Sequence, residues 1–348
     1  MVSSVVKENP TNRRTDDYKP EATLTFTVDN FLEFSRGTEQ RLQASATWDT
    51  FESFLQHDVQ ELCRVLLDNL EGKMKGNPAI ENVIPDLFEG EMKSYIRCTK
   101  VPFESSRTEK FYDIQLNVKS MGDLEKSFQE YIKVEMLDND NKYDAGEHGL
   151  QPAEKGVIFT RLPPVLHLQL MRFQYDHIAD ANVKVNDRLS FPEELDLSAF
   201  VDPTVPQDKP PIYVLHAVLV HSGDFHGGHY VVFINPKGNG RWCKFDDDVV
   251  SRATKRDAIE ANYGGEETEQ PQRAYTNAYM LVYLRRADLA RVLCDVDKDT
   301  IPHELHTIMN DEAATEEKRK KEKSEAHLYA TVNVSLWAPR FTPQLSQL

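Results

Sequence analysis

The residues best suited to chemistry lie in one block of the sequence, residues 213–252. His229 follows a glycine pair, Gly227-Gly228, and begins an apolar, β-branched run that predicts a strand. The next predicted strand, over 241–249, ends in three consecutive carboxylates, Asp246, Asp247 and Asp248. In an antiparallel pair these two strand ends can lie side by side. An imidazole oriented by a carboxylate is the base half of a cysteine or serine hydrolase.

Two other interpretations of this block stay open on the residues alone. In the first, His229 only begins a strand and the aspartates form a solvated turn. In the second, His221, His226 and His229 bind a metal together with the aspartates, as in a metal hydrolase. The histidine spacing matches no zinc-ligand motif, and zinc sites need a fixed geometry. We therefore predict no metal and no other cofactor.

A longer pattern in the same block carries a family resemblance. Tyr-x-Leu-x-Ala-Val-x-x-His-Ser-Gly, followed by Gly-Gly-His-Tyr, a tryptophan and Phe-Asp-Asp-Asp-Val, resembles the C-terminal box of ubiquitin-specific proteases. The resemblance covers about residues 46–286. It implies that His229 is the general base and Asp246 its orienting carboxylate, with Asp247 as second choice. It also implies an α+β, papain-like fold with antiparallel fingers and palm sheets.

An amphipathic helix is predicted after residue 58. Its apolar side chains, Val59, Leu62, Cys63, Leu66 and Leu70, share one helical face. Asp58 has the position of an N-cap, Glu61 that of its capping-box partner, and Gly72 that of the helix end. The phrase Gln-His-Asp-Val-Gln-Glu-Leu over 56–62 also resembles a family box whose polar residues flank the ubiquitin tail. That resemblance implies tail contacts by Asp58 and Glu61.

Further tail contacts are implied after the predicted strand 165–170. By resemblance, Arg172, Phe173 and Tyr175 line the channel for the Leu-Arg-Gly-Gly tail, with His221 beside them. A tail with two glycines needs a narrow slot, and planar aromatic rings can form its walls. The alternative is that these are ordinary aromatic residues at a strand end.

The nucleophile is where the sequence departs from the family. The family's cysteine box precedes the Gln-x-Asp box, yet no cysteine occurs before His57. Cys63 lies on an apolar helix face, Cys243 faces away from Asp246 by strand alternation, and Cys98 and Cys294 lie outside the block. We therefore expect the thumb helices to be largely missing and hydrolysis to be impaired or absent. The alternative is a ubiquitin-binding decoy or regulator.

The sequence suggests four segments. Residues 1–45 are expected to be disordered apart from a strand near Leu24, similar to the first strand of a MATH or TRAF-like domain. Residues 46–286 form the protease domain, and 287–326 a charged helical linker. Residues 327–348 resemble the first strand of a ubiquitin-like domain, with a tail.

Composition limits the partners. The 348 residues carry a net charge of −16, with 40% hydrophobic and 28% charged residues, which disfavours nucleic acid and anionic membranes. No apolar run is long enough for a membrane helix. Ubiquitin, whose tail carries arginines, is the expected partner, together with ubiquitinated proteins. Four widely spaced cysteines favour a reducing compartment, and we expect the nucleus and the cytoplasm.

Overall fold

The computed structural model describes residues 4–6, 22–24, 58–177, 180–225, 227–247, 249–265, 275–294 and 303–325. Two compact units divide the chain, residues 1–296 and 297–348, and each is described by itself. In the second unit, the described part is one charged helix, α7 (His303–Glu325). Within the described residues, no helix is long and apolar enough to cross a membrane.

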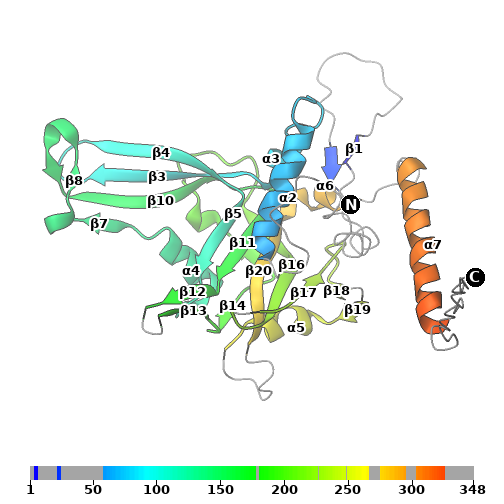
Figure 1. The fold of residues 1–348 in the computed structure, drawn as a ribbon. Helices are drawn as coiled ribbons and strands as arrows, with labels where there is room; N and C mark the ends of the chain where they lie inside the picture. The colour runs from blue at the N-terminus through cyan, green and yellow to red at the C-terminus, as the bar shows by residue number, and fades with distance from the viewer. Residues whose placement is uncertain are drawn as a thin grey trace, which may run out of the picture. The chain divides into compact units, whose positions relative to one another are not determined.

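A large twisted sheet forms the centre of the first unit (Figure 1). Its strands, in spatial order, are β19 (Val249–Ala253), β18 (Trp242–Asp246), β17 (Gly228–Ile234), β16 (Ile212–Gly223), β20 (Thr276–Arg285), β11 (Val165–Met171) and β5 (Asp113–Asn117). The short β15 (Glu194–Asp196) also pairs with β16. Neighbours are antiparallel, except that β11 and β5 run parallel. The central strand β20 is buried on both faces, and β16 is buried on one face and half-buried on the other, which explains their nearly continuous apolar sequences.

A second antiparallel sheet extends from the first as a narrow projection (Figure 1). Its order is β4 (Glu104–Phe111), β3 (Gly90–Cys98), β10 (Ala153–Arg161) and β7 (Glu135–Leu137). At its base, the fully buried Phe159 ring stacks on Tyr131 at 5.7 Å and meets Phe111 edge-on at 5.6 Å. Tyr131 ends α4 (Leu124–Tyr131), so this aromatic cluster fixes the projection against the body of the domain.

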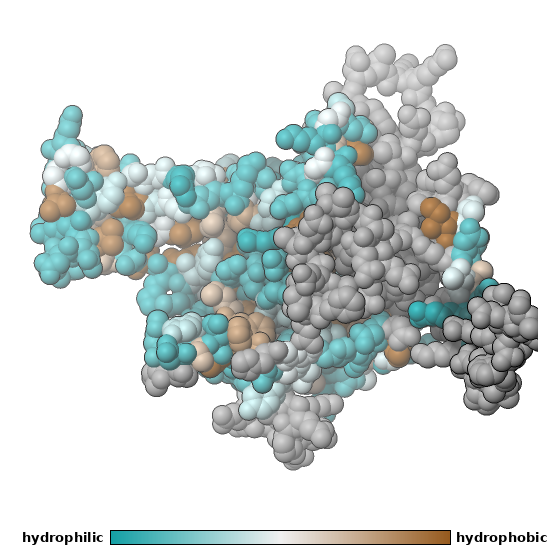
Figure 2. All heavy atoms as spheres, viewed as in Figure 1, coloured by the Kyte–Doolittle hydropathy of each residue, from teal (hydrophilic) through white to brown (hydrophobic). Residues whose placement is uncertain are grey.

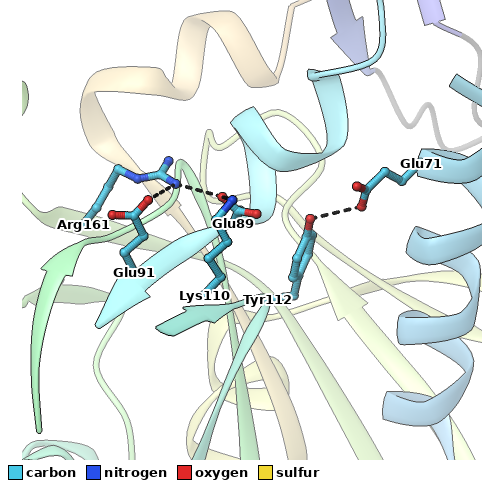
Figure 3. A network of polar contacts seen from close by, with 6 residues as sticks. All are labelled: Glu71, Glu89, Glu91, Lys110, Tyr112 and Arg161. Carbon is cyan, nitrogen blue, oxygen red and sulfur yellow. Dashed lines mark hydrogen bonds and ion pairs between the residues drawn. The ribbon is translucent and has the colours of Figure 1, made fainter. Parts of the chain in front are cut away.

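Polar contacts reinforce the same junction (Figure 3). The Arg161 guanidinium lies 3.1 Å from Glu89 and 3.2 Å from Glu91. Beside them, the Tyr112 hydroxyl donates to Glu71 at 3.1 Å, which links the sheet base to helix α2 (Val59–Met74). Since Glu89 is buried, the charge of Arg161 offsets part of its desolvation cost.

The tip of the projection has a small apolar core. Cys98, Ala145 and Ala153 are buried together there, against Val101, Phe103 and Tyr143. The His148 ring meets Phe103 at 6.2 Å. Figure 2 shows hydrophobic patches among hydrophilic residues over this end, where Met136 and Leu150 are exposed.

Helix α2 packs with α3 (Val83–Phe88) on the large sheet. Leu67 and Met74 of α2 join Ile84 and Phe88 of α3 in a buried cluster that includes Leu284 of β20. The expected helix end at Gly72 is wrong, because α2 continues to Met74. The backbone turns instead after Lys75, and Gly76 there has a φ of 86°.

Smaller elements connect these layers. They are β6 (Gly122–Asp123), β8 (Tyr143–Asp144), β9 (Leu150–Gln151), β12 (Phe173–Asp176), β13 (Ala181–Lys184), β14 (Leu189–Ser190), α5 (Lys255–Ala258) and α6 (Leu289–Val292). Helices and sheets segregated in this way confirm the predicted α+β class, with few helices beside the sheets.

The structure describes only part of the four predicted segments. β2 (Ala22–Leu24) falls within the expected strand, but its partner β1 (Ser4–Val6) lies in a stretch expected to be disordered. The division into segments stays a prediction. Residues 25–57 and 326–348, which include the proposed ubiquitin-like strand, lie outside the described residues. Helix α7 lies within the predicted helical linker.

Candidate active site

His229 and Asp246 meet at the ends of neighbouring strands. His229 is the second residue of β17, and Asp246 is the last residue of β18. The imidazole Nε2 lies 2.7 Å from Asp246 Oδ1, and the two side chains are 49% and 36% exposed. Of the two candidate carboxylates, it is Asp246 that contacts His229, while the next residue, Asp247, has a left-handed φ of 52°. The contact uses Nε2, so Nδ1 is the ring nitrogen left for proton exchange.

Lys244 completes the carboxylate's environment. Its ammonium donates to Asp246 Oδ2 at 2.5 Å, so each oxygen of the carboxylate has a separate partner. The hydrogen bond from Lys244, followed by that from His229, lowers the pKa of Asp246. Sequence reasoning missed Lys244, although strand alternation places it on the same face as Asp246 two residues later.

A metal site fits this geometry less well. Ligand atoms of His229, Asp246 and Asp247 lie within 4.8 Å of one another in the described part of the chain. However, the Lys244 ammonium already occupies one Asp246 oxygen, and its charge opposes a second cation there. His221 is not in this group, and His226 lies outside the described residues.

An aromatic cluster lies next to His229 in the sheet. His221 of β16 pairs with Tyr230 of β17, with ring centroids 4.8 Å apart. The Phe173 ring meets His221 at 5.3 Å and Tyr279 at 5.6 Å. Burial, followed by the charge of Lys184, lowers the pKa of His221 to about 4, so this imidazole is neutral at pH 7.

Glycine is required where the hairpin closes beside this cluster. Gly223 pairs with Gly228 and has a φ of 123°, which other residues rarely adopt. A side chain on Gly228 would place its Cβ 2.3 Å from His221 Nε2. The glycines therefore allow His221 to pack against the backbone that leads into His229.

Asp58 joins helix α2 to the aromatic cluster. Its Oδ1 accepts from the Gln60 amide at 2.7 Å, which makes it the helix N-cap, as the sequence predicted. Its Oδ2 accepts from the hydroxyl of the buried Tyr279, which also accepts from Gln169 at 2.9 Å. Glu61 is exposed in the first turn of the helix. Negative charge thus collects beside the rings, while Tyr230 and Tyr279 are site residues that sequence reasoning missed.

Arg172 does not lie where the sequence placed it. Its side chain is 0% exposed, which is incompatible with lining an open channel. The guanidinium instead donates to backbone carbonyls of Ala278, Val185, Asp187 and Tyr263, at 2.5, 3.1, 3.1 and 3.3 Å. The expectation of a tail contact is therefore corrected to a structural role, in which Arg172 joins separate chain segments beneath the site.

Tyr175 lies on the exposed β12–β13 hairpin. Its hydroxyl donates to Asp180, and its ring meets His177 at 5.2 Å. These contacts remain within the hairpin, and half of the Tyr175 side chain is accessible. The structure brings Phe173 and His221 together, then, and leaves Tyr175 on the neighbouring surface.

Cys63 and Cys98 are poorly placed for nucleophilic chemistry. Burial, then the charges of Asp113 and Asp58, raise the pKa of the Cys63 thiol to about 11. Cys63 lines a small cavity with Gln60, Arg64 and His167, and neither His229 nor Asp246 lines it. Cys98 is buried at the far tip of the projection.

Comparison with known proteins adds the family context. The family model "Ubiquitin carboxyl-terminal hydrolase" matches residues 5–283. The chain is 55% identical to Ubiquitin carboxyl-terminal hydrolase 7 of Drosophila melanogaster, over 85% of this chain and 26% of that protein. It is 48% identical to Ubiquitin carboxyl-terminal hydrolase 15 of Schizosaccharomyces pombe, over 84% of this chain and 26% of that protein. It is 46% identical to Ubiquitin C-terminal hydrolase 12 of Arabidopsis thaliana, over 85% of this chain and 28% of that protein. The chain spans about a quarter of the length of these relatives.

Proposed function

Because the chain belongs to the ubiquitin carboxyl-terminal hydrolase family, we propose that it binds ubiquitin and directs the ubiquitin C-terminus towards His229. The observation that carries this proposal is the 2.7 Å contact between His229 Nε2 and Asp246 Oδ1, beside a wall of aromatic rings. The substrates would be ubiquitinated proteins, cleaved at the bond after the last glycine of ubiquitin.

Each residue has a chemical role in that reaction. Asp246 accepts a hydrogen bond from His229 Nε2–H and so fixes one imidazole tautomer, which leaves Nδ1 to take a proton from a thiol. In the family's chemistry a thiolate attacks the carbonyl carbon of the isopeptide bond, and the C–N bond breaks as the imidazolium gives its proton to the leaving amine. Water, deprotonated by the imidazole, then hydrolyses the resulting thioester and releases the thiol. Lys244 keeps Asp246 ionised, so that the carboxylate stabilises the imidazolium when it forms.

The tail would enter between helix α2 and the aromatic cluster. Asp58 and Glu61 supply negative charge at the start of α2, which suits an arginine-bearing tail. Phe173 and His221 offer flat walls for the two glycines, and the exposed Tyr175 lies on the next hairpin. Asp58 is already held by the helix N-terminus and Tyr279, so it is oriented before the tail arrives.

We propose further that hydrolysis by this chain is impaired or absent. The base and its carboxylate are paired, but the Cys63 thiol, with a pKa of about 11, is almost wholly protonated at neutral pH. Cys98 is buried far along the projection, and Cys243 is on the strand that carries Asp246, at a position of the opposite face. The same observations favour a second candidate function, a decoy that occupies ubiquitin without cleaving it.

Within the family, the phrases KYDAGEHGL and LPPVLHLQLMRF are similar to the herpesvirus-associated ubiquitin-specific protease. We propose that this chain derives from that branch and acts in the nucleus and the cytoplasm. The net charge of −16 supports a protein partner over nucleic acid.

Binding and cleavage are separated by two assays on the same purified chain. Titration calorimetry with ubiquitin tests binding, and Asp58→Asn tests the tail site. Asp144→Asn, an exposed acid far along the projection, is the matched control. Cleavage of a ubiquitin–fluorophore amide then distinguishes the enzyme from the decoy. Absence of binding by the wild-type chain would contradict both candidates.

A further inference from the structure

Lys184 contacts the hairpin that carries His229, and the proposed chemistry does not use it. It is the last residue of β13 and pairs with Phe173 of β12. Its half-buried ammonium lies 2.9 Å from the His221 carbonyl, 3.0 Å from the Gly223 carbonyl and 2.6 Å from the Tyr275 carbonyl. The His221 Nδ1 lies 2.9 Å away as well.

These acceptors precede and follow His229 in the sequence, and in the sheet both segments lie on the β16 side of β17. His221 and Gly223 flank Ser222 on β16, and Ser222 pairs directly with His229 on β17. Tyr275 immediately precedes β20, where the Thr276 hydroxyl donates to Ser222 Oγ at 2.9 Å. One ammonium therefore joins the end of β16, the start of β20 and the hairpin that carries Phe173.

The arrangement needs the charged form of the side chain. An ammonium has three N–H donors and meets converging acceptors from any direction, whereas a neutral amine has only two donors. His221 accepts through Nδ1 only as the neutral imidazole, which agrees with its low pKa of about 4. The contacts of Lys184 are thus matched to a cation beside a neutral histidine.

We propose that Lys184 is a positioning residue that holds His229 and the tail-binding His221 in register with the aromatic wall at Phe173. It acts through the backbone of β16 and has no place in proton transfer. The inference rests on the proposed function only where ubiquitin binding is the readout.

Electrostatics near Lys184 give the proposal a measurable pH profile. Burial, and then the positive charge of Arg172, lower the pKa of Lys184 to about 7, while Asp224 opposes the shift. The other ionisable groups in contact are His221, which is neutral, and Tyr275, which offers its carbonyl. The protonated fraction falls about tenfold between pH 6 and pH 8 for a group with this pKa.

The test compares the wild-type chain with Lys184→Met, which keeps the side-chain length and removes the ammonium. Lys126→Met, at an exposed lysine on α4, is the matched control. Nitrogen-15 NMR of the His229 ring, without ubiquitin, reports the tautomer that donates Nε2–H to Asp246. We expect a single tautomer in the wild type and the control, and a mixture of tautomers in Lys184→Met.

Ubiquitin titrations at pH 6 and pH 8 supply the second readout. We expect the affinity of the wild type to fall by up to about tenfold at pH 8, and that of Lys184→Met to be weak at both pH values. An unchanged tautomer and an unchanged pH profile in Lys184→Met would overturn the proposal. If the tautomer changes but no protein binds ubiquitin, the positioning role stands and the proposed function fails. Urea unfolding of each variant verifies that it is folded.

Discussion

Replacing Arg172 separates a structural role from a binding role. If Arg172 only contacted the ubiquitin tail, replacing it would change the free energy of unfolding little. If its buried guanidinium holds several chain segments together, replacing it would lower the free energy of unfolding strongly. Its acceptors are backbone carbonyls of Val185 and Asp187 between β13 and β14, of Tyr263 after α5, and of Ala278 within β20. We expect Arg172→Met to destabilise the fold strongly.

The magnitude follows from the bonds. A hydrogen bond from a charged donor contributes about 1.5–3 kcal/mol, and a buried carbonyl left without a donor costs about 1–3 kcal/mol. These effects are not additive, and water can enter part of the space, so we expect a loss of about 4–6 kcal/mol in the free energy of unfolding. That is a large share of the ~5–15 kcal/mol typical of a folded domain.

The assay is urea unfolding at 25 °C, followed by circular dichroism, on Arg172→Met and Arg172→Lys. Lysine keeps the charge but loses the planar fork, so we expect a loss of about 2–3 kcal/mol and a protein that still folds. Arg188→Met is the matched control, because Arg188 is exposed and stacks on the Tyr263 ring at 4.8 Å. Its loss should cost under about 1 kcal/mol.

One result would refute the reasoning about Arg172. If Arg172→Met unfolds within about 1 kcal/mol of the wild type while ubiquitin affinity falls sharply, the guanidinium belongs to the tail channel. The buried position of its side chain would then describe only the chain without ubiquitin.

The other predictions concern separate parts of the fold. Asp288, whose side chain is 1% exposed, contacts Lys209 at 2.5 Å, so Asp288→Asn should lower the urea midpoint by an amount equivalent to about 3 kcal/mol; a change below about 1 kcal/mol would argue against the pair. Lys244→Met should raise the pKa of Asp246, measured by carbon-13 NMR of the carboxylate, because the largest cause of its low value is removed. A carboxyl whose pKa is lower in the folded than in the unfolded chain stabilises the fold at pH values above its unfolded pKa, and this stabilisation is lost as the pH falls through its folded pKa. Lys244→Met should therefore be less stable than the wild type at pH 7, and the difference should disappear below the folded pKa of Asp246. Cys63 should react with iodoacetamide at pH 8 far more slowly than it does in urea, judged by peptide mass spectrometry, and equal rates would contradict its raised pKa.

Local patterns in the sequence were enough for much of the fold. Alternation and glycine breaks predict His229 and a run of aspartates at adjoining strand ends, whereas the choice of Asp246 came from the family resemblance; the structure has His229 and Asp246 in contact. The N-cap at Asp58 also follows from residue type and position. The end of helix α2 did not follow from residue type, because Gly72 is accommodated inside the helix and it is Gly76 that adopts the left-handed conformation after it.

Long-range contacts were beyond the sequence. Nothing local distinguishes an arginine at a strand end that faces solvent from Arg172, whose carbonyl partners lie up to 106 residues away. The same holds for Lys184, which reaches Tyr275 across 91 residues. Such side chains are identified by the backbone that surrounds them, which only the assembled sheets supply.

The central claim is that this chain engages the ubiquitin tail at His229 without supplying a thiol there. The most direct test incubates the purified chain with ubiquitin that carries a thiol-reactive group at its C-terminus. Intact mass detects a covalent adduct, and size-exclusion chromatography of the same sample detects bound ubiquitin. The account predicts a complex without an adduct. A stoichiometric adduct would contradict it, because one of the cysteines would then reach the reactive end of the tail.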